Sequence, residues 1–438
     1  MAVNDVRKMP QQGTRNILLN KEAIVIDMDE PGIEGSKKLD EGNSEVWVKP
    51  LKGGDFAVIL FNLGDPVLKT IQIFLIFTLL TCAIFGQATQ SVTKQVPPGA
   101  QNTRVLQRQY PPQPTRKEVA IMEAALKYNK DPKSTLWPAH DPVLIKQDSV
   151  FYLFTTGGGV SSSTDLINWK QEKPVFDQSP SWITDDLIPG FQGGRGYWAP
   201  DIQLVNGTYY LYYSYSAFGK NTSVMGVATN KTLHPDSPDF KWVDHGLVVQ
   251  SVPNRDMWNA IDPNLIMDRN QGWLVFGSFW GGIKLVKLST DLLSVDKPEV
   301  WYTVARRPRT FALDDTDPGD GTIEGPFIYK HFQYYYLFVS LDYCCRGVSS
   351  NYNVVVGRSR NVEGPYVDKE GKLLSRGGGT PMAKGNEIWA GVGHTGHYNI
   401  DGKSIMIMHG YDKRDNGRSK LIIREMKWDR ADWPSIDL

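Results

Sequence analysis

The chain has 438 residues, of which 41% are apolar and 22% are charged, so it has room for two or three globular domains with a sizeable core. Lysine plus arginine equals aspartate plus glutamate at 48 each, so neither a basic surface for nucleic acid nor an acidic tail for a basic partner is indicated. Three cysteines occur without a CxxC or Cys/His cluster, which excludes a structural zinc finger on ligand count.

Residues 1–66 contain the run EVWVKPLKGGDFAVILFNLGD, which predicts two strands joined by a Gly-Gly turn. Together with NKEAIVIDMDEPGIEG, this hairpin resembles the C-terminal tail of family 27 α-galactosidases, a β-domain that follows a catalytic barrel. The barrel is missing, and so are the galactosidase carboxylates. We therefore expect an incomplete β-sandwich fragment without activity of its own.

Residues 67–88 have the pattern of a secretory signal peptide. Lys69 supplies a minimal positive region, an apolar run extends from Ile73 to Phe85, and Gly86-Gln87-Ala88 offers a small-x-small cleavage site. The run is shorter than the ~20 residues that span a bilayer, so no stable membrane span is expected after processing. We predict secretion, or transfer to a periplasm, with a mature N-terminus near Thr89. The alternative is a buried strand or helix of a globular domain.

Residues 89–130 are polar and interrupted by Pro97-Pro98 and Pro111-Pro112, which is typical of a linker and predicts an N-terminal lead-in to the next domain. One short helix is predicted within them, at RKEVAIMEAALKY.

Residues 131–438 contain an internal repeat. Each copy begins with an acidic residue or histidine beside Pro or Gly, runs through a short apolar strand, turns on polar residues and enters an aromatic-rich strand. The copies are PAHDPVLIKQDSVFYLFTT, YWAPDIQLVNGTYYLYYSY, NAIDPNLIMDRNQGWLVFGSF, IEGPFIYKHFQYYYLFVS and GVGHTGHYNIDGKSIMIMHG. Their leading residues, Asp141, Asp201, Asp262, Glu324 and His394, are 60, 61, 62 and 70 positions apart.

Five units of this length predict an all-β fold, a five-bladed β-propeller of four-stranded blades. A sandwich with strands about ten residues apart does not explain a period near sixty residues. If the units are equivalent, the four carboxylates and the histidine converge at one end of the central channel. Buried carboxylates that lie close together raise one another's pKa values, and glycoside hydrolysis uses such an arrangement.

Seven motifs occur in order at blade spacing: WPAHDP, YWAPDI, NAIDP, SFWGGI, IEGP, LDYCCRG and GVGHTG. In this order they resemble the arabinan endo-1,5-α-L-arabinanases of glycoside hydrolase family 43, across Trp137 to Asp437. The resemblance implies a propeller that cuts α-1,5-linked arabinofuranose chains with inversion. It assigns Asp141 as general base, Glu324 as general acid, and Asp262 as the residue that orients the acid and tunes its pKa.

The same resemblance makes His394 of GVGHTG the holder of one channel cation, expected to be calcium. This chain reads GHT where members of the family often read GHN, and calcium prefers many oxygen ligands, so water must supply most of its shell. A hydrogen-bonded core histidine is the alternative. His397 is expected to be a surface or packing residue. Asp201 is expected to be structural or adjacent to substrate.

Substrate binding is predicted for Trp198, Asn259, Phe279 and Trp280, which belong to the motifs beside the channel. An aromatic face there can stack on a furanose ring, with core packing as the competing interpretation. The vicinal pair Cys344 and Cys345 is either two thiols or one disulfide in a small ring.

Two alternatives share part of this pattern. An exo-acting α-L-arabinofuranosidase or a β-xylosidase would use the same carboxylates in a blocked pocket. A non-catalytic sugar-binding propeller would keep the aromatic residues and lose the carboxylates, but all three are present. The expected partner is therefore a polysaccharide, the arabinan side chains of pectin.

Overall fold

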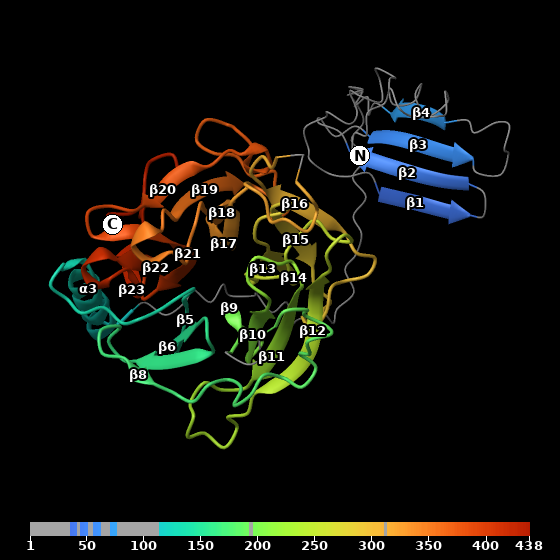
Figure 1. Cartoon of the computed structure of the whole chain (residues 1–438). Helices are drawn as coiled ribbons and strands as arrows, with labels where there is room; N and C mark the ends of the chain where they lie inside the picture. The colour runs from blue at the N-terminus through green and yellow to red at the C-terminus, as the bar shows by residue number, and fades with distance from the viewer. Residues whose placement is uncertain are drawn as a thin grey trace, which may run out of the picture. The chain divides into compact units, whose positions relative to one another are not determined.

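The computed structural model describes residues 36–41, 44–50, 56–62, 71–76, 114–191, 196–310 and 313–438. The chain divides into two compact units, Met1–Gln113 and Pro114–Leu438. Both units are drawn in Figure 1. Within the described residues, no helix is long and apolar enough to cross a membrane.

The first unit contains one antiparallel sheet with the strand order β1-β2-β3-β4. Its strands are β1 (Ser36–Glu41), β2 (Ser44–Pro50), β3 (Phe56–Asn62) and β4 (Ile71–Ile76). The strands β2 and β3 form the predicted hairpin, with Val46 opposite Leu60. The strand β4 lies within the signal-like segment and pairs with β3, as the alternative interpretation of that segment expects. The signal peptide stays a prediction, and the rest of residues 67–88 lies outside the described residues.

The second unit is a five-bladed β-propeller, which confirms the predicted fold (Figure 1). Each of the first four blades is a four-stranded antiparallel sheet in chain order.

The first blade consists of β5 (Val143–Gln147), β6 (Val150–Thr155), β7 (Gly159–Ser163) and β8 (Lys170–Gln171). The second consists of β9 (Trp198–Val205), β10 (Thr208–Tyr215), β11 (Ser223–Asn230) and β12 (Val243–Ser251). The third consists of β13 (Asn264–Asp268), β14 (Gln271–Phe276), β15 (Ile283–Lys287) and β16 (Trp301–Ala305). The fourth consists of β17 (Ile323–His331), β18 (Tyr334–Leu341), β19 (Asn353–Ser359) and β20 (Thr380–Lys384).

The fifth blade closes the ring with help from the start of the first. Its own strands are β21 (Trp389–Ile400), β22 (Lys403–Asp412) and β23 (Arg418–Glu425), and a two-stranded ribbon of β24 (Lys427–Trp428) and β25 (Pro434–Ser435) follows. Pro138 forms an antiparallel bridge with Lys420, and the Leu421 N–H donates to the Trp137 carbonyl at 2.7 Å. The segment just before the first blade therefore takes the place of a fourth strand, so that no blade edge is left open there.

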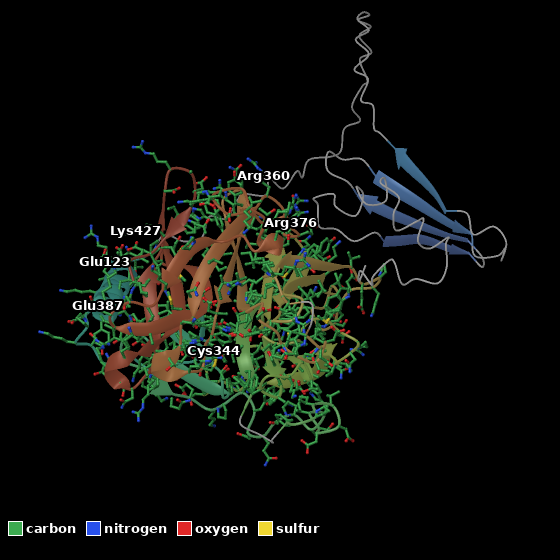
Figure 2. All side chains as sticks on the ribbon, turned by 45° about the horizontal axis from the view of Figure 1, so that its top comes forward. Glu123, Cys344, Arg360, Arg376, Glu387 and Lys427 are labelled. Atoms are coloured by element: carbon green, nitrogen blue, oxygen red, sulfur yellow. A yellow bond between two sulfur atoms is a disulfide. The ribbon has the colours of Figure 1, made fainter. Side chains whose placement is uncertain are left out.

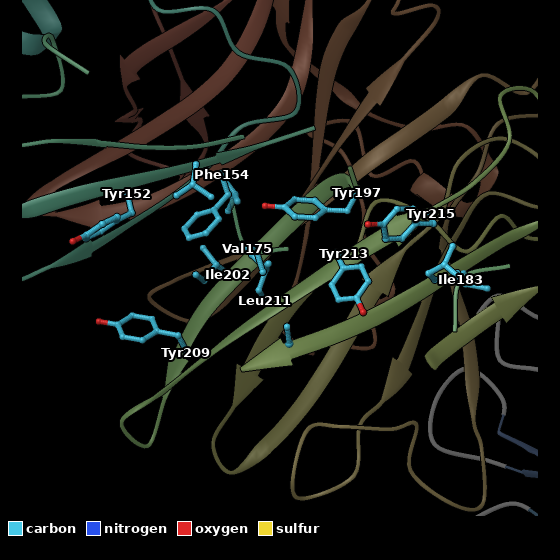
Figure 3. Packing of buried hydrophobic residues seen from close by; sticks show 14 of the residues in the cluster. Tyr152, Phe154, Val175, Ile183, Tyr197, Ile202, Tyr209, Leu211, Tyr213 and Tyr215 are labelled. Atoms are coloured by element: carbon cyan, nitrogen blue, oxygen red, sulfur yellow. The ribbon is translucent and has the colours of Figure 1, made fainter. Parts of the chain in front are cut away.

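Apolar side chains of neighbouring blades pack between the sheets, as the alternation of β10 shows (Figure 3). In TYYLYYSY, Tyr209, Leu211, Tyr213 and Tyr215 belong to the cluster shared with the first blade. Tyr212, which points to the other face, belongs to the cluster shared with the third blade. Because side chains alternate along a strand, one tyrosine-rich segment contributes to two interfaces.

The helix α3 (Arg116–Lys130) matches the predicted helix but belongs to the propeller unit instead of a linker. Thr115 and Glu118 form a capping box at its N-terminus. Asn129 accepts the Ile423 N–H at 3.0 Å through its side chain, and its backbone carbonyl accepts from Arg424 at 3.1 Å. Burial lowers the pKa of Arg424 to about 10, so the Asn129 carbonyl accepts a hydrogen bond from a cation that is buried in the protein.

Asp201 has a structural role, which is one of the two roles expected for it from the sequence. It is buried, and its carboxylate accepts the Leu265 N–H of the next blade at 2.7 Å. Asn264 repeats the arrangement one blade on, accepting the Ile328 N–H at 2.8 Å. Both side chains tie one blade to the next through a backbone amide, which would otherwise be buried without a partner.

Asp201→Asn is predicted to make stability less dependent on pH. Burial raises the pKa of Asp201 to about 7, so the folded state holds a proton that the unfolded state releases between about pH 4 and pH 7, and stability falls as pH rises through that window. Asparagine keeps an oxygen acceptor without the charge. Relative to the unchanged chain, the variant's free energy of unfolding should therefore rise by roughly 2 to 4 kcal/mol across the window. Urea denaturation at several pH values measures this, and a difference constant with pH would contradict it.

Two shortened chains should separate the linker from α3. A chain beginning at Thr89 should melt like the full propeller unit. A chain beginning at Asp131 should lose about 3 kcal/mol or more, because the buried Met122 and Leu126 and the contacts of Asn129 are removed. Thermal unfolding followed by circular dichroism compares them, and equal melting temperatures would refute the role given to α3.

Candidate active site

In each blade, one residue just before or within the first strand has a left-handed backbone. These residues are Asp141, Ala199, Asp262, Gly325 and His394, with φ values of 48°, 39°, 61°, 55° and 51°. Such a conformation costs most L-residues about 1 kcal/mol or more, so its recurrence in five blades marks a constraint of the fold. It brings the equivalent backbone positions to the same end of the channel.

This geometry corrects the predicted ring of leading residues. In the second blade Ala199, and not Asp201, holds the equivalent position. In the fourth blade Gly325 holds it, and Glu324 comes from the position before. In the sequence, the copies were aligned by the acidic residue or histidine near the start of each one. In the structure, the equivalent positions are those with the left-handed backbone conformation. Asp201 consequently binds the neighbouring blade instead of facing the cavity.

A cavity of about 520 Å³ opens at this end of the channel, a size typical of small-molecule and substrate sites. Its lining comes from all five blades and includes every residue proposed from the sequence: Asp141, Trp198, Asn259, Asp262, Phe279, Trp280, Glu324 and His394. The structure thus brings together eight side chains that are spread over more than half of the chain.

Asp141 lies among three histidines and a hydroxyl. Thr156 donates to its Oδ2 at 2.6 Å, and His140 Nδ1 is 2.8 Å from the same oxygen. His394 Nδ1 is 3.1 Å from Oδ1, and the Asp141 N–H donates to His409 Nδ1 at 3.1 Å. Burial would raise the pKa of Asp141, but the three imidazoles hold it well below its ordinary value. This carboxylate is therefore ionised, as a general base must be.

Asp262 and Glu324 have the opposite environment. Burial raises the pKa of Asp262 well above its ordinary value, and the neighbouring charges of Glu324 and Asp141 add to this. Burial also raises the pKa of Glu324; hydrogen bonds from Ser278, at 2.8 Å to Oε2, and Tyr352 oppose the rise, while Asp141 adds to it. The two carboxyl groups titrate as a pair that retains a proton at higher pH than either would alone.

Gly325 connects this pair to the fifth blade. Its N–H donates to Asp262 Oδ2 at 3.0 Å, so Asp262 holds the backbone directly after Glu324. A side chain at this position would place its Cβ 3.0 Å from His394 Nδ1. Only glycine combines the left-handed conformation with this close approach.

The four predicted sugar-binding residues differ in what they offer to a ligand. Trp280 is buried, and its indole N–H donates to the Asp315 carbonyl at 2.9 Å, which favours the packing interpretation. Asn259 is buried and accepts from Ser223 at 2.5 Å. Trp198 and Phe279 are partly exposed to the cavity, and the Phe279 ring centroid lies 6.3 Å from that of Tyr343. These two rings are the better candidates for stacking on a sugar.

Cys344 and Cys345 form a disulfide in the cavity wall, which settles the alternative that the sequence left open. Cys344 is labelled on the propeller in Figure 2. Arg346 follows them and lies over the Tyr343 ring, 3.7 Å from its centroid. His397 of the fifth blade is a buried packing residue, stacked on Phe338 of the fourth blade at 3.6 Å between centroids.

The donors near His394 do not form an oxygen-rich calcium shell. His140, Asp141 and His409 offer one carboxylate among imidazoles, whereas calcium takes six to eight oxygen ligands. His394 Nδ1 and His409 Nδ1 are already engaged by Asp141. Calcium at His394 stays a prediction, which elemental analysis before and after chelation can test.

Several site residues were missed in the sequence. His140 had a signal, because it precedes Asp141 in HDP. Ser278 and Thr156 lie within quoted motifs, SFWGGI and the first repeat copy, but nothing in these motifs marked them as partners of carboxylates. Tyr352 had no signal, because it lies outside every motif. His409 and Tyr411 alternate on β22 and reach the site only because the ring closes.

Residues 137–434 match the family described as Glycosyl hydrolases family 43. The chain belongs to this family. Its propeller unit is therefore a family 43 glycoside hydrolase domain, which confirms the resemblance on which the site was first predicted.

Two curated relatives and one solved structure illustrate the similarity. The chain is 48% identical over 301 residues to an extracellular exo-α-(1→5)-L-arabinofuranosidase of Cellvibrio japonicus, covering 68% of this chain and 86% of that protein. It is 41% identical to an extracellular endo-α-(1→5)-L-arabinanase of Bacillus subtilis, covering 68% and 87%. The structure of a Cellvibrio cellulosa α-L-arabinanase complexed with arabinohexaose matches with a TM-score of 0.67 and 46% identity, covering 69% of this chain and 96% of that one.

Residues 41–84 match a second family, described as Alpha galactosidase C-terminal beta sandwich domain. This confirms the resemblance of the N-terminal segment. The matched range continues through β4 into the signal-like run, in agreement with the pairing of β4 and β3.

Asp262→Asn should move the alkaline limb of the kcat/KM profile of this family 43 hydrolase to lower pH, by about one unit. A negative neighbour raises the pKa at which the pair loses its last proton, so removing it lets Glu324 lose that proton earlier. Asp201→Asn is the matched control, because it changes another buried aspartate that faces the next blade. An alkaline limb that stays in place in Asp262→Asn would argue against the coupling.

Proposed function

We propose that this family 43 hydrolase cleaves α-1,5-linked L-arabinan with inversion of configuration. The observation that carries the proposal is the contrast between carboxyl groups lining one cavity. Imidazoles hold the pKa of Asp141 low, whereas burial raises the pKa of both Asp262 and Glu324; the charge of Glu324 adds to the shift of Asp262, and the charge of Asp141 adds to both. An inverting glycosidase needs one carboxyl group in each state at the same pH.

The proposed roles follow from these environments. Asp141 accepts a proton from the water that attacks the anomeric carbon, and its negative charge is stabilised by Thr156 and the histidines. Glu324 donates a proton to the departing glycosidic oxygen. Asp262 fixes the backbone next to the acid through the Gly325 N–H and keeps the acid's pKa high. A non-catalytic sugar-binding protein would not need this division of protonation states.

The substrate class is supported by the relatives, whose names specify α-(1→5)-L-arabinan-type bonds, and by the arabinohexaose in the matching Cellvibrio cellulosa structure. In this chain, the faces of Trp198 and Phe279 are proposed to stack on furanose rings. Both relatives are named extracellular, which supports the proposal that this protein is secreted as well, through residues 67–88.

Internal cleavage is the mode that the order of motifs predicts, and it is retained as the first candidate. Exo cleavage is the second candidate. It is favoured by one observation, the 48% identity to a relative named as an exo-acting enzyme, against 41% to one named as an endo-acting enzyme.

Products of linear α-1,5-arabinan, resolved by size over time, distinguish the two modes. Internal cleavage gives a spread of oligosaccharides and a rapid fall in viscosity while few new reducing ends have formed. Exo cleavage gives one small product from the start, with viscosity nearly constant. A β-linked xylan serves as the control polymer, and activity on xylan without activity on arabinan would reject the proposed substrate class.

Glu324→Ala and Asp141→Ala should fail differently. Without its acid, Glu324→Ala should lose about 10³-fold or more on arabinan but recover partly on an aryl α-L-arabinofuranoside, because that leaving group needs little protonation. Asp141→Ala lacks the base and should stay inactive on both. Proton NMR of early products should show the β-anomer from the α-linked substrate. Initial release of the α-anomer, or a wild-type rate for Asp141→Ala, would overturn the mechanism.

A further inference from the structure

A chain of hydrogen bonds runs from the cavity wall to the back of the proposed base. The Cys345 N–H donates to the Tyr411 hydroxyl at 2.7 Å, and this hydroxyl lies 2.9 Å from His140 Nε2. On the other side of the same ring, His140 Nδ1 is 2.8 Å from Asp141 Oδ2. His409 joins the chain through its Nε2, 3.2 Å from the Tyr411 oxygen.

Counting donors and acceptors fixes where the protons lie. The Asp141 N–H donates to His409 Nδ1, so a neutral His409 carries its proton on Nε2 and donates it to Tyr411. The Tyr411 oxygen then accepts from both His409 and the Cys345 amide, and its own proton needs an acceptor. It can go to His140 Nε2 at 2.9 Å or to Cys345 Sγ at 3.8 Å, and the imidazole nitrogen is both the closer and the stronger acceptor. A neutral His140 is consequently protonated on Nδ1, where it faces the carboxylate.

We propose that Tyr411 is a positioning residue for Asp141: held by the amide of Cys345, its hydroxyl keeps His140 in the tautomer whose Nδ1–H donates to Asp141 Oδ2. Tyr411 acts through His140, since it does not line the cavity, whereas His140 and Asp141 do. The wrong tautomer would present a lone pair of His140 to the lone pairs of the carboxylate.

The Cys344–Cys345 disulfide restricts the backbone that supplies the first donor in this series of hydrogen bonds. Bonding of adjacent side chains closes a small ring that restricts the peptide unit between the two residues, which carries the Cys345 N–H. Cys345 itself has a left-handed backbone, with φ of 64°. The peptide unit that carries the donor to Tyr411 is therefore restricted in conformation by the disulfide.

This inference rests on the proposed function insofar as Asp141 is the base, but the tautomer of His140 can be measured without substrate. Burial opposes but does not cancel the effect of the Asp141 carboxylate, which raises the pKa of His140, so the tautomer is measured at a pH high enough for this ring to be neutral. In the full chain labelled with ¹⁵N-histidine, the Nδ1 and Nε2 chemical shifts should then show the Nδ1–H form. Tyr411→Phe removes the donor to Nε2, and the His140 signals should then shift toward a mixture of tautomers. Failure of the arabinanase assignment would leave this result unchanged.

The kinetic effect should fall on kcat. Tyr411→Phe should lower kcat by about tenfold or more with KM within about twofold, as for other residues that orient a group in direct contact with the reaction. Tyr366→Phe is the matched control: it removes a buried hydroxyl that donates to the Val362 carbonyl at 2.7 Å in the packing between the third and fourth blades. It should change stability at most.

Two substitutions of His140 test the route independently of how well Tyr411→Phe folds. The amide nitrogen of Asn stands near the position of Nδ1 and that of Gln near Nε2, so His140→Asn should retain more activity than His140→Gln. In the His140→Asn background, adding Tyr411→Phe should cost clearly less than its tenfold effect in the unchanged protein, because only the contact of Tyr411 with His409 then connects it to Asp141. The Cys344→Ala/Cys345→Ala double variant should shift the His140 tautomer in the same direction as Tyr411→Phe.

The outcomes against the proposal are specific. An unchanged His140 tautomer in Tyr411→Phe, or a full tenfold cost of Tyr411→Phe in the His140→Asn background, would overturn it. An unchanged tautomer and kcat in the double cysteine variant would overturn the part given to the disulfide.

Discussion

The pairing of Trp137 and Pro138 with β23 is the constraint on which the proposed site depends. It closes the ring, and it also places Asp141 only three residues beyond Pro138, against the fifth blade. His394 and His409, which hold the pKa of Asp141 low, both come from that blade. Without closure the carboxylate would keep only His140 and Thr156 as neighbours, so the chemistry of the base is a consequence of the same backbone hydrogen bonds that hold the propeller together.

The fold was predictable from sequence because the propeller repeats. A period near sixty residues, with a strand pair in each copy, leaves few architectures open, and the structure has the predicted five blades. Asp141 and Asp262 were predictable for a related reason, since each precedes a proline at the same point of a blade. The alignment failed at Asp201, because a sequence repeat records residue type, whereas Ala199 holds the left-handed position that defines equivalence.

The supporting residues were less predictable, because tertiary structure alone brings them to the carboxylates. Tyr411 lies 270 positions after Asp141, and Tyr352 belongs to a segment without a repeat motif. The cysteine pair illustrates the same limit: adjacent cysteines permit either thiols or a disulfide, and the choice depends on the surrounding loop. The helix α3 was recognised by its pattern, but its burial against β23 has no signature in a segment that otherwise reads as a linker.

The five-bladed ring separates two protonation states by assigning them to different blades. The fifth blade and the start of the first supply imidazoles around Asp141, which stabilise a negative charge. The third and fourth blades supply burial, the Ser278 and Tyr352 hydroxyls and a backbone amide around Asp262 and Glu324, with no cation from either blade among the causes that shift their pKa values. Because like charges raise the pKa of the second group, the ionised base itself helps to keep the acid protonated. The division of acid from base therefore follows from where each blade places its side chains. A substitution that changes the charge of the base also changes the pKa of the acid.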